Sequence, residues 1–262
     1  MHWSDEGFVL GVRRHGEGSV ILEAMTRAHG RHLGLVRGGR SSRHQPLLQP
    51  GNSVALNWRA RLDEHLGSFQ VEGLTLRAAR YMPSALALNV LGSVAALARM
   101  LPERDPHPAV FEQLVLLAEH MDDADLAPAL MVRLELSMLA ELGFGLDLER
   151  CVATGVTDDL VYVSPRSGRA VSAGAGAPYH RKLLALPPFL RAGFTSGAPD
   201  AAQVLAGFAI TGHFLLRHVY EPRGVAPPDG RARVVEIVRS RAAGPPTSPT
   251  AGGPPPNGQQ AG

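Results

Sequence analysis

The first eighty residues contain short apolar runs separated by turn residues. Three runs lie at 8–12, 19–25 and 32–36, and the segments 52–62 and 68–76 alternate apolar and polar side chains. Short runs of this kind, bounded by Gly, His, Asp and Arg, are typical of β-strands in a meander. Five such strands in about 75 residues predict a small closed barrel of the five-stranded OB-fold type, and an SH3-like barrel is the open alternative.

From Pro83 onward the spacing of apolar positions changes to the helical period. The acidic residues at 122–125 and Gly143 bracket one segment, and are expected to cap its start and its end. Strands followed by helices predict an α+β protein. The expected helices cover 85–101, 109–121, 126–142, 201–220 and 231–241.

The segment 151–182 interrupts the helical pattern, because it is rich in Gly and Ser and contains a single strand-like run, 160–163. After Ala242 proline and glycine dominate, which is typical of a chain that cannot bury a core. The expected organisation is a barrel domain over 1–80, a helical domain over 81–242 that carries the insertion, and a disordered tail over 243–262.

Charge is distributed unevenly along the chain, although the formal net charge is only +2. Residues 1–80 contain eleven arginines and seven acids, whereas residues 103–150 contain three arginines and eleven acids. Arginines pair with phosphates and release condensed counterions, so a basic barrel indicates DNA binding. The alternative is that these arginines only solvate the outer face of the sheet. The candidate DNA-binding residues are Arg13, Arg14, Arg27, Arg31, Arg37, Arg40 and Arg43.

Several kinds of chemistry have no sequence support. A single cysteine excludes an intrachain disulfide framework, and no secretory signal or membrane span is evident, so a cytoplasmic location is expected. A P-loop needs a Gly-Lys step, but the only lysine, Lys182, follows Arg181. We therefore predict a protein that is not an enzyme and has no catalytic residue, cofactor or metal.

The order and spacing of four segments resemble a known family. FVLGVRRHGEGSVILEAMT (8–26), Gly30, VRGGRSS (36–42) and ELGFGLDLERC (141–151) stand as they do in RecO, the bacterial recombination-mediator family. The resemblance implies an N-terminal OB-fold and a helical domain with a small zinc-finger-like module. It also implies binding to single- and double-stranded DNA, strand annealing, and partnership with RecR and single-stranded-DNA-binding protein for loading RecA.

The chain departs from this family at the zinc site of the module. Many relatives carry two CxxC pairs there, but this sequence has Cys151 at the first position and Thr154, Ser172 and Ala175 at the other three. A structural zinc needs four thiolate or imidazole ligands. We therefore expect a degenerate module without zinc, in which Cys151 is a small buried hydrophobic residue.

Two functional hypotheses follow. The first is a non-enzymatic mediator of DNA annealing in recombinational repair, and the second is a protein-interaction adaptor that never touches nucleic acid. They differ in whether the seven arginines converge on one face. The resemblance also implies that the helical domain receives the acidic, apolar tail of single-stranded-DNA-binding protein. The sequence offers Arg191, Arg217, Arg223 and the 231–241 helix as basic candidates for that contact, without choosing among them.

Overall fold

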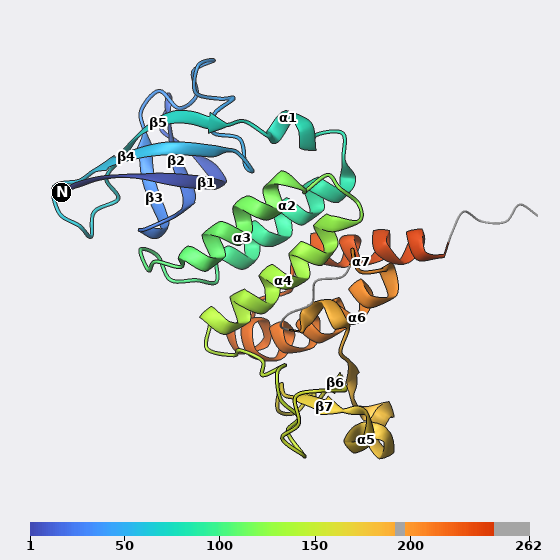
Figure 1. Cartoon of the computed structure of the whole chain (residues 1–262). Coiled ribbons are helices and arrows are strands. Elements are labelled where there is room, and N and C mark those ends of the chain that lie inside the picture. The colour runs from blue at the N-terminus through green and yellow to red at the C-terminus, as the bar shows by residue number, and fades with distance from the viewer. Residues whose placement is uncertain (192–196, 244–262) are drawn as a thin grey trace, which may run out of the picture.

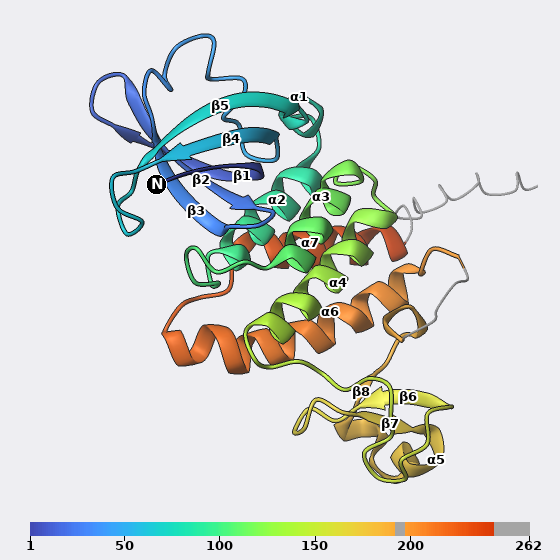
Figure 2. The same cartoon turned by 60° about the vertical axis from the view of Figure 1, so that its left-hand side comes forward.

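The computed structural model describes residues 1–191 and 197–243. A barrel lies at one end of the molecule, a layer of helices fills the middle, and a small sheet lies at the opposite end (Figures 1 and 2). The predicted α+β architecture is therefore confirmed. The tail predicted over 243–262 lies, apart from Ala243, outside the described residues.

Five strands form a closed barrel in the order β1-β2-β3-β5-β4. The sequence predicts the five strands but not their order. β1 pairs antiparallel with β4 along its first half and with β2 along its second half. A parallel bridge between Leu35 and Ser68 closes the barrel. The strands are β1 (His2–His15), β2 (Ser19–Thr26), β3 (Gly30–Val36), β4 (Ser53–Arg59) and β5 (Ser68–Thr75).

The first strand is longer than its apolar run predicts, because it begins at His2 rather than near Phe8. The added residues are mostly polar and pair through the backbone with β4. Two of their side chains bind partners that are distant in the chain. Ser4 Oγ donates to Asn57 Oδ1 at 2.5 Å, and Asp5 Oδ2 accepts the Ala28 N–H at 2.8 Å. Backbone pairing, rather than apolar alternation, therefore sets the start of this strand.

The five predicted helices are present with shifted ends. Asp123 Oδ1 accepts the N–H groups of Asp125 and Leu126 at 2.9 and 3.0 Å, so the acidic turn does cap the helix that follows it. Gly143 has a φ of +86° and follows that helix, as expected for a C-terminal glycine. A short helix that the sequence does not predict, α1 (Ala78–Tyr81), precedes them. The predicted helices are α2 (Ala85–Ala98), α3 (Pro108–Glu119), α4 (Leu126–Glu141), α6 (Ala201–Leu215) and α7 (Asp229–Ala242). A π-type turn (Leu216–Tyr220) continues α6.

The barrel and the helices share part of one apolar core. Phe8, Leu10 and Met25 come from barrel strands but pack with the helical residues. At Gly30, where φ is +65°, a Cβ atom would lie 1.9 Å from the carbonyl oxygen of Asp105. Glycine at this position therefore lets the segment between α2 and α3 rest directly against β3.

Arg77, which lies between β5 and α1, joins the barrel to the helices through buried polar contacts. Its N–H donates to Asn52 Oδ1 at 2.8 Å, and its guanidinium donates to Ser53 Oγ at 2.9 Å. Its Nε also donates to Glu119 Oε1 on α3 at 3.0 Å. The hydrogen bond from Arg77 lowers the pKa of the Glu119 carboxyl, which favours the charged carboxylate.

The insertion forms a small three-stranded sheet in the order β7-β6-β8. The sequence predicts only β6 (Leu160–Val163), because the other two strands are too short to show a period. A four-residue helix and a 3₁₀ segment connect β7 to β8. These elements are β7 (Ala170–Ser172), α5 (Ala173–Gly176), η1 (Ala177–Lys182) and β8 (Leu184–Ala185).

Cys151 lies at the base of this small sheet and is buried, as predicted. Its sulfur accepts the Ser172 N–H at 3.3 Å and lies 3.4 Å from Ser172 Oγ. Burial acts to raise the pKa of the thiol, but hydrogen bonds from Ser172 and Thr154 outweigh burial and lower this pKa to about 6. Thr154 and Ser172, which the family resemblance puts at expected zinc-ligand positions, thus interact with Cys151 through hydrogen bonds.

We expect the purified protein to contain far less than one zinc per chain, and a chelator to leave its midpoint of thermal unfolding unchanged, because a single thiolate cannot hold the metal. Metal analysis and a melting curve with and without chelator test this. The control is the triple variant Thr154→Cys/Ser172→Cys/Ala175→Cys, in which zinc binding and chelator sensitivity should appear together. Stoichiometric zinc in the wild type would contradict the prediction.

A buried ion pair fixes the three long helices of the C-terminal half. Glu135 on α4 is 1% exposed, and Arg231 on α7 donates to both of its oxygens at 2.7 and 3.0 Å. Thr211 on α6 donates to the same carboxylate. Burial with this carboxylate also raises the pKa of the Tyr220 phenol to about 12. Both oxygens of the buried Glu135 carboxylate therefore accept hydrogen bonds.

We expect Arg231→Met to lower the free energy of unfolding by about 3–5 kcal/mol, because it leaves the Glu135 carboxylate buried without its cation. The double variant Glu135→Leu/Arg231→Met should recover most of this loss, since a well-packed apolar pair removes the uncompensated charge. Urea unfolding of the wild type and both variants measures the effect. A single variant as stable as the wild type would contradict the prediction.

Candidate nucleic-acid interface

The structure divides the seven candidate arginines into two groups. Arg27 and Arg31 face the helices, whereas the other five lie on the exposed end of the barrel around the β1–β2 turn and the loop after β3. Arg27 and Arg31 differ from the other five because each has acidic partners, and some of these come from the helical domain. The exposed five are Arg13, Arg14, Arg37, Arg40 and Arg43.

Arg27 is compensated by acids on both sides of the domain junction. Its guanidinium pairs with Glu6 of the barrel at 2.9 Å and with Glu112 of α3. It also lies over the ring of Phe111, 4.7 Å from the centroid. The side chain thus holds α3 against the barrel, and its charge is already balanced.

Arg31 has the same kind of role and is more deeply placed, with a side chain only 12% exposed. It pairs with Glu23 at 2.9 Å and donates from Nε to the Leu101 carbonyl at 3.2 Å. Glu23 also accepts from Arg99 of the helical domain at 2.8 Å. Glu23 is therefore shared by one arginine from each side of the junction.

The remaining five arginines are exposed, and in the described part of the chain none has a carboxylate within 4 Å. Arg13, Arg14 and Arg40 line one groove of about 320 Å³ whose floor includes Val20 and Leu48. The groove brings together the β1–β2 hairpin and the basic loop, two segments that the sequence alone does not place side by side. Uncompensated guanidinium groups along a groove suit the oxygens of a phosphate backbone.

The basic loop that follows β3 is held in place by hydrogen bonds. The Arg40 N–H donates to the Gly18 carbonyl at 3.3 Å, and the Arg40 guanidinium donates to the Glu17 carbonyl, both in the β1–β2 turn. Within the loop, Gln45 Nε2 donates a hydrogen bond to the Arg40 carbonyl at 3.0 Å. At the far end of the loop, Asn52 Nδ2 donates to the Pro46 carbonyl at 2.7 Å. The loop is thus docked on the hairpin and built into the junction that contains Arg77.

Aromatic side chains near the barrel surface are mostly occupied by one another. Trp3 stacks on His29 with ring centroids 4.1 Å apart and on Trp58 at 5.6 Å, so its indole already has two stacking partners. Trp58 and Phe69 are buried. Burial also lowers the pKa of His32 in this cluster to about 4, which leaves it neutral at pH 7. Base stacking therefore has little support on this part of the barrel, and contacts to the backbone have more.

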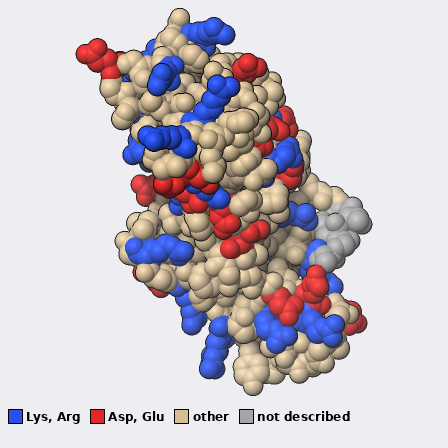
Figure 3. All heavy atoms as spheres, turned by 90° about the vertical axis from the view of Figure 1, so that its left-hand side faces the viewer, with Lys and Arg blue, Asp and Glu red and all other residues tan. Residues whose placement is uncertain are grey.

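The face shown in Figure 3 has basic side chains over the barrel and again in its lower part, with a band of acidic side chains across the middle. The band agrees with the acidic composition of residues 103–150. A polyanion that approaches this face is attracted to the barrel and repelled by the middle of the molecule.

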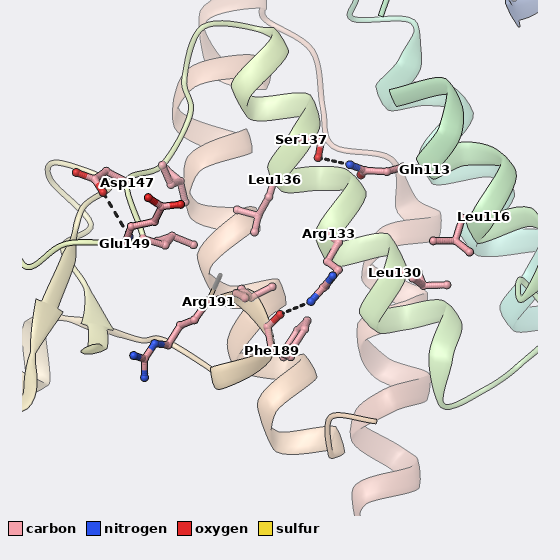
Figure 4. A pocket seen from close by; sticks show the side chains of 13 residues that line it. Gln113, Leu116, Leu130, Arg133, Leu136, Ser137, Asp147, Glu149, Phe189 and Arg191 are labelled. Carbon is pink, nitrogen blue, oxygen red and sulfur yellow. Dashed lines mark hydrogen bonds between the residues drawn. The ribbon is translucent and has the colours of Figure 1, made fainter. Parts of the chain in front are cut away.

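A hollow of about 630 Å³ lies between α3, α4 and the segments at 146–149 and 188–191 (Figure 4). Its walls include the exposed Leu116 of α3 and partly buried leucines of α4. Two arginines and two acids, Asp147 and Glu149, also line it. Arg133 donates to the Phe189 carbonyl at 2.8 Å, whereas Arg191 lies at the rim and has no carboxylate partner in the described chain. Sequence reasoning named Arg191 but missed Arg133, because its mid-helix position gave no signal. Arg217, Arg223 and α7 do not line this hollow.

Residues 1–191 and 197–243 contain no group of three or more His, Cys, Asp or Glu side chains arranged to hold a metal ion. No helix within them is long and apolar enough to cross a membrane.

Comparison with protein families accounts for both halves of the chain. The family model described as Recombination protein O N terminal matches residues 1–77, and Recombination protein O C terminal matches residues 86–225. The chain belongs to the RecO family. The family suggested by the four sequence segments is therefore confirmed, and membership in RecO gives the chain a general role in DNA repair.

Individual RecO relatives are similar along nearly their whole length. A protein of Methylorubrum populi, named DNA repair protein RecO, is 58% identical over 241 residues, which cover 90% of this chain and 98% of the relative. The protein of that name from Chelativorans sp. is 61% identical over 238 residues, with 91% and 96% covered. The one from Mesorhizobium japonicum is 59% identical over 239 residues, with 91% and 94% covered.

Proposed function

We propose that this RecO chain is a non-enzymatic, DNA-binding and strand-annealing mediator of recombinational repair. It acts in the cytoplasm with RecR and single-stranded-DNA-binding protein to load RecA, without a cofactor or a metal. The observation that carries the DNA-binding part is the set of five exposed arginines without acidic partners at one end of the barrel. The named partners rest on the family resemblance.

We assign the barrel to the OB-fold class and the insertion to a degenerate zinc-finger-like module. The closed five-stranded barrel, in the order β1-β2-β3-β5-β4 with β1 shared between two neighbours, supports the first assignment. Barrels of this class commonly bind oligonucleotides. The hydrogen bonds between Cys151 and Ser172 support the second, because they occupy the place of two metal ligands.

The mechanism is electrostatic. Two complementary strands repel each other through their phosphates, and arginines that neutralise one backbone lower this repulsion so that the second strand can approach. Binding releases counterions, which makes the affinity depend on salt but not on sequence. No bond is made or broken in this scheme, so it needs no catalytic group.

The alternative function, a protein-interaction adaptor, has less support. An adaptor that never touches nucleic acid would be favoured if the arginines were scattered over the surface and only interacted with solvent. Three of the five exposed arginines instead share one groove, and the loop that carries Arg37, Arg40 and Arg43 is docked beside Arg13 and Arg14. A single basic surface of this kind fits a continuous polyanion better than isolated charges do.

We expect the variant Arg37→Ala/Arg40→Ala/Arg43→Ala to bind single-stranded DNA more weakly at low salt. Each phosphate contact on a single strand contributes about 0.7 to the slope of log affinity against log salt concentration. Loss of three contacts should therefore reduce the magnitude of this slope by about 2. Fluorescence-anisotropy titration of a labelled strand at several salt concentrations measures both quantities.

The control is Arg217→Ala/Arg223→Ala/Arg233→Ala, which removes the same charge from exposed helical positions without an ion-pair partner among the described residues. Its affinity and salt slope should stay close to those of the wild type. Equal losses in the two variants would show that net charge alone, and not the barrel surface, governs binding. Absence of wild-type binding at low salt would favour the adaptor function.

We further propose that the hollow between α3 and α4 receives the acidic, apolar tail of single-stranded-DNA-binding protein. The exposed Leu116 and the partly buried leucines beside it suit apolar side chains, and Arg191 at the rim suits a carboxylate.

We expect Arg191→Glu to weaken binding of a peptide with an acidic, apolar C-terminus by about tenfold or more, because it reverses a charge at the rim. Binding of DNA to the barrel should be unchanged. Isothermal titration with the peptide measures the first effect, and Arg217→Glu is the matched control. Peptide affinity that is the same in Arg191→Glu as in the wild type would exclude this hollow as the site.

A further inference from the structure

The connection η1 in the small module is exposed along its whole length. None of its six residues is buried, and Tyr179 has 62% of its surface open to solvent. The next three residues of η1, which are His180, Arg181 and Lys182, are also exposed. A short connection that contributes nothing to the core, yet presents a large aromatic ring beside two fixed positive charges, has no role in the packing of the module.

The charge of the module supports a functional role for this connection. Residues 150–191 contain six Lys and Arg and only two acids, Asp158 and Asp159. Arg181 and Lys182 have no carboxylate partner in the described structure. The helical segment that precedes the module, 103–150, is strongly acidic. The chain therefore has a second basic region, separated in sequence by the acidic helices from the basic barrel.

The same separation exists in space. The barrel and the small sheet lie at opposite ends of the molecule with the helices between them (Figures 1 and 2). A strand bound at the barrel would have to cross the acidic helices to reach the module, and their charge opposes this path. The two basic regions are thus placed to contact different nucleic-acid segments.

We propose that Tyr179, His180, Arg181 and Lys182 form a second nucleic-acid contact, which takes a single-stranded segment different from the one on the barrel. The exposed tyrosine ring stacks on a base, and the adjacent charges pair with phosphates. This proposal rests on the proposed DNA-binding function and extends it, because a copy bound to one strand through the barrel then recruits a second strand and raises its local concentration.

A strand-capture experiment tests the proposal with the full chain. A single strand is fixed to beads, the protein is bound to it at low salt, and a labelled strand that is not complementary to the first is added. The wild type should retain the second strand. In Tyr179→Ala/Arg181→Ala/Lys182→Ala, capture should fall by about tenfold or more, from loss of a stacked base and two phosphate contacts.

Two controls separate the module from the barrel. The affinity of the same variant for the first strand alone should stay within about twofold of the wild type, because the two regions are distant. The variant Arg217→Ala/Arg233→Ala loses the same formal charge elsewhere and should capture the second strand normally. Unchanged thermal unfolding of the module variant, expected because η1 is exposed, excludes a folding defect.

The two proposals fail in different ways. If the wild type does not bind the first strand at low salt, the proposed function is wrong, and so is this inference. If the first strand binds but capture of the second is unaffected by the module substitutions, only the module proposal is wrong. Retention of the second strand then has another cause, such as two barrels in an oligomer. In that case η1 would contact a different kind of partner, such as an acidic protein segment.

Discussion

The position of the barrel on the helices depends on the buried arginine Arg77. Its side chain enters the junction with a full charge, which would be costly without partners. Ser53 from the barrel and Glu119 from α3 supply them, while Asn52 binds its backbone and that of Ala78. Because Asn52 also fixes the end of the basic loop, one polar cluster sets the placement of the barrel, the helices and the candidate DNA surface together.

Arginines serve three different purposes in this chain, and their surroundings decide which. Arg231 is largely buried with a carboxylate and joins helices, and Arg31 is as deeply placed at the domain junction, where Glu23 balances it. Arg37 and Arg43 are exposed and without acidic partners in the described structure. Only the last kind keeps its charge available to a polyanion, since a guanidinium that already has a carboxylate gains little from a phosphate.

Much of the fold is predictable from the sequence, because it depends on local periodicity. The helical spacing in 109–121 follows directly from which side chains face the core, whereas in 68–76 only Phe69 and Val71 do so and Leu74 and Leu76 are exposed. The candidate site was predictable only in part. Arg27 and Arg31 look like Arg37 in sequence, but Glu112 and Glu103, which compensate them, are brought close only by the tertiary fold. The hollow beside Arg133 likewise depends on segments that are distant in the chain.

The docking of the basic loop on the β1–β2 turn has a thermodynamic consequence. A loop that is disordered before binding must lose backbone entropy when its ligand arrives, at about 1–2 kcal/mol for each residue that is fixed. Here that loss has already occurred during folding, and the Arg40 side chain is already bonded to Glu17, so mainly the side-chain rotamers of Arg37 and Arg43 remain to be ordered. A ligand of this surface can therefore be exchanged for another without a refolding step.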